Sequence, residues 1–492
     1  MGEEMLKRAP ADKPATSLAP LAVDLDGTLL KVDTLSESLV ANLFRRPLAT
    51  IGACFAILRG RAAFKRALAD VGLPDIDALP ANDEFAAYLK LEKARGRRLH
   101  LATAAEERIA RAVAGRFEFF DSVAGTKDGL NLKGAAKRAD LEQRFPDGYA
   151  YAGDSRADIA VWKGAAGAIL VGVRESLASD VARTGVPIEA EIRRNRRGAL
   201  GAWRKALRLH QWSKNVLLLA PLFLAHKYID PEAVIACIVG FFILGVVASA
   251  TYMVNDLADL SADRRHRTKS ERPFASGAIP IQYGLVAAPA MIAGGLAAAY
   301  ALSPAFAGTL LTYLATTLAY SFGLKRVPLV DVFMLGALYA LRVLMGVALL
   351  GVGLSPWLIA FSVFFFYSLS LAKRHAEVIA AADKPPNEEL PGRGYRPSDW
   401  PVTLAAGAAS AAASIIIIVL YLTEEAFPSG VYRSPEWLWA APAIMTLWTQ
   451  RIWLLAHRGE LDDDPVAFAV KDRGSLLLGA ALVIFFAAAT IL

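Results

Sequence analysis

Long apolar runs separated by charged loops occupy the chain beyond residue 213, and they constrain its fold more than any other feature. A run of about twenty apolar residues is long enough to cross a bilayer as a helix. The first run is short and contains Pro221, so we expect a broken or tilted helix there. The runs predict nine membrane-spanning helices, at 214–226, 233–254, 283–302, 305–321, 329–351, 356–373, 402–422, 436–456 and 474–492.

Lysine and arginine are distributed unevenly over the segments that connect these runs. The loop at 255–282 is strongly basic, whereas the connections at 303–304 and 352–355 contain no lysine or arginine. Basic residues accumulate on the cytoplasmic side of membrane proteins. The pattern therefore predicts a multi-pass protein of a bacterial-type inner membrane, with its N-terminal part in the cytoplasm and its C-terminus outside.

Composition changes along the 492 residues, of which 55% are hydrophobic. Residues 1–188 read as an ordinary globular domain, and 214–492 as an all-α membrane bundle. The basic linker between them, 189–213, is expected to lie on anionic lipid as an interfacial helix. The net charge of +7 is therefore assigned to contact with the membrane surface, and no nucleic-acid partner is expected.

An aspartate-rich stretch, T-Y-M-V-N-D-L-A-D-L-S-A-D, ends the second apolar run. On a helix, Asn255, Asp259 and Asp263 share one face and Asp256 lies beside them. Carboxylates this close repel each other unless a cation lies between them, and Mg²⁺ commonly joins carboxylates to substrate phosphates. A basic run follows at once (Arg264, Arg265, Arg267, Lys269, Arg272). We expect a magnesium diphosphate site here; a solvated loop is the alternative.

Near the N-terminus, L-A-V-D-L-D-G-T-L-L reads as a buried strand followed by Asp24 and Asp26 on one side of the chain. At a strand end, one carboxylate can attack phosphorus while the other moves a proton. Two later strands, ending near 103 and 153, carry further polar groups. These groups, with the lysines between them, are Thr103, Lys133, Lys137, Asp154 and Asp158.

The four motifs in this order resemble the haloacid dehalogenase (HAD) superfamily of phosphatases over residues 18–188. The resemblance implies a Rossmann-like α/β domain with Asp24 as nucleophile and Asp26 as general acid and base. It also implies Thr103 as phosphate ligand, Lys137 (Lys133 as second choice) as the motif lysine, and Mg²⁺ held by Asp24 and Asp154. Asp158 would support this group of metal ligands. Residues 33–90 would form a helical cap that screens substrates; an inactive scaffold is the alternative.

The apolar runs and the N-D-x-x-D-x-x-x-D motif resemble the UbiA superfamily of intramembrane prenyltransferases over residues 200–492. Members bind a Mg²⁺ diphosphate at the cytoplasmic end of a helical bundle. Members with aromatic acceptors carry a second acidic motif after the sixth span, where this chain reads S-L-A-K-R-H-A-E-V-I. A basic loop at that place favours substrates with additional phosphate groups.

The stretches D-R-R-H-R-T-K-S-E-R-P-F-A-S-G, Y-S-F-G-L-K and A-K-R-H-A-E look like the decaprenyl-phosphate phosphoribosyltransferase branch of that superfamily. The resemblance implies Mg²⁺-dependent transfer of 5-phosphoribose from phosphoribosyl pyrophosphate to a polyprenyl phosphate. Asn255, Asp256, Asp259 and Asp263 would hold the metal, and the three aspartates would be catalytic. Substrate ligands would be Lys269, Arg272, Tyr320, Lys325, Lys373 and Arg374. Arg342, inside a span, is either functional or part of a structural pair.

The two halves together predict a two-step synthase in which the soluble domain removes a phosphate, the 5-phosphate of the lipid product. One alternative is transfer of a polyprenyl group from its diphosphate to an aromatic or quinone precursor, as in 4-hydroxybenzoate polyprenyltransferases. Another is a lipid-binding or transport protein with a regulatory soluble domain. The expected partners are therefore membrane lipid, a polyprenyl phosphate or diphosphate, and phosphoribosyl pyrophosphate or an aromatic co-substrate.

Overall fold

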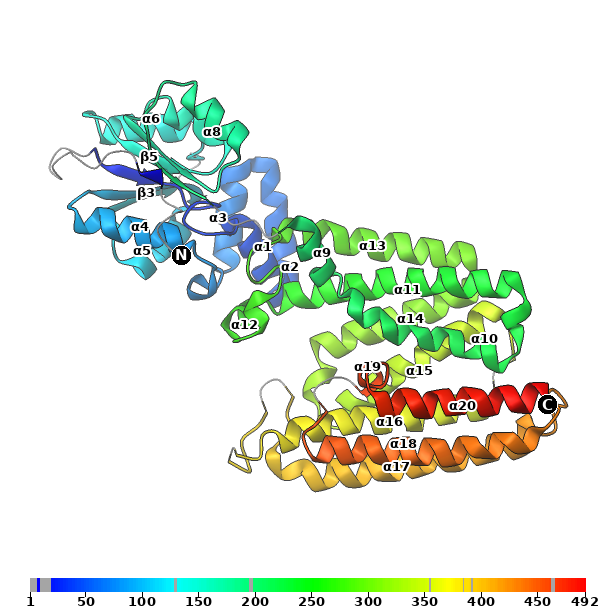
Figure 1. Cartoon of the computed structure of the whole chain (residues 1–492). Coiled ribbons are helices and arrows are strands. Elements are labelled where there is room, and N and C mark those ends of the chain that lie inside the picture. The colour runs from blue at the N-terminus through cyan, green and yellow to red at the C-terminus, as the bar shows by residue number, and fades with distance from the viewer. Residues whose placement is uncertain are drawn as a thin grey trace. The chain divides into compact units, whose positions relative to one another are not determined.

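The computed structural model describes residues 7–8, 19–127, 131–193, 198–353, 355–383, 385–390, 393–461 and 465–492 (Figure 1). Within it the chain forms two compact units, Met1–Leu207 with Tyr252–Ala287, and Arg208–Thr251 with Ala288–Leu492. The aspartate-rich loop thus belongs to the same unit as the soluble domain. The domain boundaries drawn from the sequence at 188 and 213 stay predictions.

The first unit is built on a seven-stranded sheet in the order β1-β7-β6-β5-β2-β3-β4. Neighbouring strands are parallel except for the pair β1 and β7. The central strands are apolar because helices cover both faces of the sheet. The strands are β1 (Lys7–Arg8), β2 (Leu21–Val23), β3 (Leu99–Glu106), β4 (Ser122–Thr126), β5 (Ala150–Gly153), β6 (Gly167–Val171) and β7 (Ile188–Ile192).

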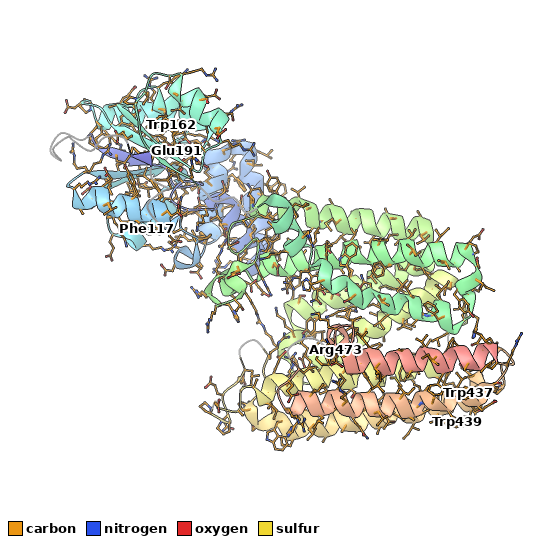
Figure 2. The ribbon with its side chains drawn as sticks, viewed as in Figure 1. Phe117, Trp162, Glu191, Trp437, Trp439 and Arg473 are labelled. Carbon is orange, nitrogen blue, oxygen red and sulfur yellow. The ribbon has the colours of Figure 1, made fainter. Side chains whose placement is uncertain are left out.

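Helices α4 (Asp83–Ala94) and α5 (Glu107–Phe117) pack on one face of the sheet. Helices α6 (Ala135–Arg144), α7 (Ile159–Trp162) and α8 (Glu175–Ala182) pack on the other (Figure 1). Trp162 is fully buried there and donates its indole N–H to the Tyr151 carbonyl at 3.0 Å (Figure 2). The parallel α/β fold predicted for the N-terminal part is confirmed, and it gathers the carboxyl ends of β2, β3 and β5 at one edge.

Two sequence expectations differ locally from this sheet. Strand β3 continues three residues beyond Thr103, to Glu106, with an irregular register against β4. Strand β7 adds residues 188–192 to the sheet, where we expected the basic linker to begin. Ala190 and Ile192 are buried, so alternating burial holds this segment in the sheet. After it, the linker forms a short helix, α9 (Ala199–Ala206), while 194–197 lie outside the described residues.

A group of helices, here called the cap, lies between β2 and α4 in the sequence. The cap begins at Asp33, whose carboxylate accepts the Ser36 N–H at 2.7 Å and so caps α1. Gly60, at φ +105°, makes the turn between η2 (Phe55–Arg59) and α3 (Arg61–Val71). The cap contains α1 (Thr34–Arg45), α2 (Pro47–Cys54), η2 (Phe55–Arg59), α3 (Arg61–Val71) and η3 (Ile76–Ala78).

The remaining elements are helical and account for the predicted membrane bundle. The loop 252–287 contains α12 (Leu260–Arg265) and η7 (Lys269–Glu271) between the ends of two long helices. The long helices are α11 (Pro231–Ala258), α13 (Ile281–Leu302), α14 (Pro304–Phe322), α15 (Val330–Leu350), α16 (Pro356–Ile379), α17 (Trp400–Tyr421), α18 (Ala440–His457) and α20 (Arg473–Ile491). Shorter pieces are η5 (Leu209–Leu219), α10 (Ala220–Leu224), η6 (Lys227–Ile229), η8 (Leu324–Arg326), η9 (Pro397–Asp399), η10 (Leu422–Ala426), η11 (Pro435–Trp439) and α19 (Pro465–Ala469).

Six helices of the described chain are long and apolar enough to cross a membrane: α11, α13, α15, α16, α20 and the helical stretch Pro397–Ala426. The chain is therefore a multi-pass membrane protein, but the predicted total of nine spans is not confirmed. The run at 214–226 forms 3₁₀ turns and the five-residue α10 instead of one helix. Helices α14 and α18 are continuous, yet threonine, tyrosine and other polar residues dilute their apolar character.

Different kinds of side chain lie near the two ends of α20 (Figure 2). Arg473 begins the helix, whereas the labelled Trp437 and Trp439 lie near its other end. Trp437 contacts Phe485 with ring centroids 5.8 Å apart. Aromatic residues at the membrane interface and basic residues on the cytoplasmic side are typical of membrane helices.

Close approach between helices in the second unit depends on particular glycines. A Cβ added at Gly346 of α15 would overlap the carbonyl oxygen of Leu218 and touch the ring of Pro221. A Cβ added at Gly308 of α14 would meet nothing within 4 Å. Small residues at positions such as 346 allow helix backbones to pack directly against each other.

We predict that Gly346→Ala lowers the stability of the second unit by about 1–3 kcal/mol, because the overlap with backbone atoms forces a shift. Gly308→Ala is the matched control and should leave stability unchanged or raise it by up to about 1 kcal/mol, since alanine favours helix. Thermal unfolding of the two variants in the same detergent measures both effects. Equal unfolding midpoints for the two variants would contradict the close contact between Gly346 and Leu218.

Candidate functional site

Asp24 lies directly after β2 and forms the centre of a carboxylate cluster. Its Oδ1 accepts the Leu25 N–H at 2.9 Å and the Lys137 ammonium at 2.9 Å. Oxygens of Asp24, Asp154 and Asp158 lie within 4.8 Å of one another. The sequence prediction that these residues meet is therefore matched by the geometry, because β2 and β5 are adjacent parallel strands that end at the same edge.

Lys137 supplies the positive charge nearest to Asp24. It extends from α6, is 3% exposed, and also donates to the Tyr151 hydroxyl at 2.8 Å. Tyr151 in turn donates to Asp158 Oδ1 at 2.8 Å. Of the two lysines considered from the sequence, the geometry favours Lys137, although Lys133 also lines the cavity. Tyr151 was missed, because nothing in Y-A-Y-A-G-D shows which tyrosine faces the carboxylates.

Asp26 is placed to exchange protons. Its Oδ1 accepts the backbone N–H of Thr34, the first residue of α1, at 2.8 Å. Burial, with a smaller contribution from the Asp33 charge, raises the pKa of Asp26 to about 7. A carboxyl group with that pKa can be protonated or ionised near neutral pH, as a general acid and base requires.

The donor set fits a hard divalent cation such as Mg²⁺. Burial is the largest cause that raises the pKa of Asp24, and burial followed by the Asp24 charge raises the pKa of Asp154 to about 8. Both oxygens of Asp158 accept hydrogen bonds, from Tyr151 and from Ser155. Asp24 and Asp154 would therefore hold the metal while Asp158 orients the cluster. Gly27, at φ +80°, leaves the Asp154 carboxylate the room that a Cβ would occupy.

A cavity of about 680 Å³ opens over this cluster and is lined by residues from the sheet, the cap and 280–282. Thr103, the predicted phosphate ligand, is fully buried beneath it, and its hydroxyl accepts the Ala105 N–H at 3.0 Å. Ala104 and Ala105 line the cavity instead. The cap contributes Lys65, which donates to Asn131 at 2.8 Å and to the Ala104 carbonyl. The only sequence signal for Lys65 was the basic run of the cap.

In the aspartate-rich loop, Arg272 joins two of the predicted metal ligands. Its guanidinium donates to Asp256 at 3.1 Å and to Asp263 at 2.6 Å. Both carboxylates are buried, and burial raises the pKa of Asp263 against the lowering effect of Arg272. The predicted helical spacing is nearly kept, since α11 ends at Ala258 and α12 resumes after Asp259.

The other predicted residues of this loop are more open. Asn255 and Asp259 are half-buried, whereas Lys269 is exposed. The Asp259 N–H donates to the Asn255 carbonyl at 3.0 Å, so the two residues lie one helical turn apart. Metal binding by this loop stays a prediction, as does substrate binding by Lys269 and Arg272.

In the second unit, Arg374 forms a buried ion pair. Its guanidinium donates to Asp331 at 2.7 Å and also contacts Glu377. Tyr395 donates its hydroxyl to the other Asp331 oxygen at 2.7 Å. Arg374 is fully buried, so this geometry resembles a structural pair. Its proposed role as a phosphate ligand stays a prediction.

The remaining predicted ligands of the second unit are half-buried. Tyr320 accepts a hydrogen bond from Arg393 at 2.7 Å, and Lys325 and Lys373 have partly accessible side chains. Arg342 is held by Asn215, by the Leu338 carbonyl and by the Tyr313 hydroxyl at 3.0 Å. Of the two possibilities drawn from the sequence for Arg342, these contacts favour a structural pair.

The sequence model of the UbiA prenyltransferase family matches residues 216–477. The chain belongs to this family. Among its relatives, the Uncharacterized protein y4nM of Sinorhizobium fredii is 44% identical over 467 residues, which cover 95% of this chain and 90% of that protein. The family accounts for the helical bundle, and it makes the chain a UbiA-type transferase.

Decaprenyl-phosphate phosphoribosyltransferases are homologues of this UbiA family member. The enzyme of Mycobacterium tuberculosis is 35% identical over 178 residues, 35% of this chain and 59% of that enzyme. A structure of phosphoserine phosphatase in its apo form covers 33% of this chain and 90% of its own, with 18% identity and a TM-score of 0.25. The soluble part has a parallel α/β fold, and its resemblance to HAD phosphatases stays a prediction.

We predict that the affinity of the soluble site for Mg²⁺ rises with pH between 6 and 8, by up to about tenfold per unit. Without metal, Asp154 has a raised pKa of about 8, so below that pH the cation must displace a proton. Isothermal titration calorimetry in buffers of different ionisation enthalpy measures both affinity and proton release. Asp154→Asn should remove this heat, and a pH-independent affinity would refute the assignment.

Proposed function

We propose that this UbiA-family enzyme transfers 5-phosphoribose from phosphoribosyl pyrophosphate to a polyprenyl phosphate, and that its soluble domain then removes the 5-phosphate from the lipid product. One observation carries the proposal: a carboxylate–lysine cavity suited to phosphate monoesters lies in the same compact unit as the aspartate-rich loop. The relation to decaprenyl-phosphate phosphoribosyltransferases supports the first step.

In the transfer step, an oxygen of the lipid phosphate forms a bond to C1 of the ribose. The bond from C1 to the pyrophosphate oxygen breaks, and pyrophosphate leaves with the electron pair. Mg²⁺, held by Asn255, Asp256, Asp259 and Asp263, would offset charge on the leaving group. Arg272, which already joins Asp256 and Asp263, keeps these carboxylates in place.

The geometry around Asp24 supports the proposed hydrolytic step. The Asp24 carboxylate attacks phosphorus, the ester oxygen leaves, and Asp26 gives that oxygen its proton. Water then attacks the phosphorus of the aspartyl phosphate, and Asp26 takes up the proton. The bond from phosphorus to the Asp24 oxygen breaks, so inorganic phosphate leaves and the Asp24 carboxylate is restored. Lys137, bonded to Asp24, fixes the nucleophile and counters phosphate charge, and Mg²⁺ bound by Asp24 and Asp154 would supply further compensation.

The basic loops and the phosphorylated substrates place both steps at the cytoplasmic face of an inner membrane in this proposal. A prenyl diphosphate would suit a site with two acidic motifs. This chain instead has a basic loop after α16, so the lipid would be a polyprenyl phosphate. Tethering both sites to one chain raises the local concentration of the intermediate at the second site.

We predict that purified protein in lipid nanodiscs converts phosphoribosyl pyrophosphate and a polyprenyl phosphate into lipid-linked ribose, in a reaction that requires Mg²⁺. The double change Asp259→Asn with Asp263→Asn should lower turnover by at least about a hundredfold, because charge on the leaving group is no longer offset. Glu271→Gln, an exposed position of the same loop, is the control. Mass spectrometry of the lipid products decides, and normal turnover in the double variant would sink the proposal.

We predict that Asp24→Asn makes lipid-linked ribose that retains its 5-phosphate, because the nucleophile is lost while the transferase is intact. Release of inorganic phosphate should fall by at least about a thousandfold. Asp83→Asn, at a side chain that is 88% exposed on α4, should behave as wild type. Unchanged phosphate release in Asp24→Asn would exclude the phosphatase assignment and leave the transfer step standing.

A further inference from the structure

The cap exposes an unusual amount of apolar surface along α2 and η2. The five large side chains concerned, here called the apolar cap face, are between 46% and 85% exposed: Leu48, Ile51, Phe55, Ile57 and Leu58. Burying such side chains is normally worth about 1.5–3 kcal/mol each. Their grouping on one short helical stretch, Pro47–Arg59, marks a surface that meets an apolar environment.

The charges around the apolar cap face have one sign. Residues 45–66 contain no aspartate or glutamate, and they contain six basic residues: Arg45, Arg46, Arg59, Arg61, Lys65 and Arg66. Two of these basic side chains have protein partners, since Arg46 donates to the Val71 carbonyl and Lys65 reaches into the cavity. An apolar helical face bordered by positive charge is complementary to the interface of an anionic bilayer.

The cap is also connected to polypeptide that enters the membrane. Glu37 of α1 and Arg264 of α12 form a two-bond ion pair, at 2.6 and 2.9 Å, with side chains only 4% and 6% exposed. A second ion pair joins Asp75 to Arg265 at 2.5 Å. The loop that carries these arginines connects α11 to α13, both of which are long and apolar enough to be membrane spans. The cap is therefore bonded to a loop that lies at the ends of membrane helices.

The apolar cap face continues into the Asp24 cavity. Ile57 belongs to the face and lines the cavity, together with Phe64 and Arg61 of α3. Residues 280–282, at the start of α13, line the same cavity. A phosphate at Asp24 would thus have an apolar wall on the side of the cap and a membrane helix end beside it.

We infer that the apolar cap face docks on the cytoplasmic surface of an anionic bilayer, and that it guides a lipid-linked phosphate monoester from the membrane to Asp24. The apolar side chains enter the acyl boundary while the flanking arginines contact lipid phosphates. The second half of this inference rests on the proposed function, because it takes the lipid product as the phosphatase substrate. The docking itself does not.

The docking is tested on the full-length protein in nanodiscs that contain anionic lipid. A fluorophore is attached at Leu58→Cys (84% exposed), in a background with Cys54→Ala, and in a separate protein at the control position Leu91→Cys of α4 (58% exposed). Cys237 is fully buried and is left unchanged. We expect spin-labelled lipid to quench the label at position 58 at least twice as strongly as the label at 91, and aqueous iodide to quench it less.

Two outcomes would overturn the docking. If iodide quenches both labels equally and spin-labelled lipid quenches neither, the apolar cap face is in water. If the label at position 58 is shielded from both quenchers, and the unlabelled Leu58→Cys variant forms disulfide-linked dimers through that position, the face is an interface between copies of the chain.

The guiding role is tested with the double change Leu48→Gln and Leu58→Gln, at two positions of the face that do not line the cavity. We expect hydrolysis of a lipid-linked phosphate monoester to fall at least tenfold, while hydrolysis of water-soluble p-nitrophenyl phosphate is unchanged. Equal rates on the lipid substrate would overturn the guiding role. If wild type hydrolyses p-nitrophenyl phosphate but no lipid-linked ester, the proposed function is wrong. The docking is then still tested independently by the quenching experiment.

Discussion

Buried carboxylates that need a compensating positive charge organise this protein. Asp24 is removed from water at the edge of the sheet, and Lys137 lies 2.9 Å from it. Removing one partner from a buried pair typically costs about 3–5 kcal/mol. The pair alone does not balance the cluster, because Asp154 and Asp158 lie within the same few ångströms. A divalent cation bound here, as we propose, would complete the balance and would prepare the cluster to accept a phosphate.

The same constraint appears in the loop and in the bundle, with different outcomes. Arg272 holds Asp256 and Asp263 together in the loop, and its side chain is 27% exposed. Arg374 and Asp331 are fully buried in the second unit and are closed off by Tyr395. The Arg272 cluster is therefore partly open to solvent, whereas the Arg374 pair is closed to it.

Much of the soluble site could be predicted because strand order fixes it. Asp24, Asp26 and Asp154 follow apolar strands, and parallel strands bring their ends together. The burial of Thr103 could not be predicted, since β3 continues to Glu106, and its role as a phosphate ligand stays a prediction. Tyr151 and Lys65 could not be found, because their roles depend on which side of a strand or cap helix meets the cavity.

The membrane part shows a different limit of sequence analysis. Apolar runs located the helices, but length and hydropathy alone do not distinguish a continuous span from the broken segment at 214–226. Arg342 illustrates the same point, because a charged residue within a span signals function or structure equally. Its bonds to Asn215 and Tyr313, which no local sequence pattern encodes, favour a structural role.

We propose that one chain first transfers a phosphorylated ribose to lipid and then dephosphorylates it. The most direct measurement follows phosphoribosyl pyrophosphate that carries ³²P in the 5-phosphate and ¹⁴C in the ribose. With wild-type protein, the ratio of ³²P to ¹⁴C in the lipid fraction should start at its value in the substrate and then fall, while ³²P accumulates as inorganic phosphate. A lipid fraction that never gains ¹⁴C, or one whose ratio stays constant, would contradict the account.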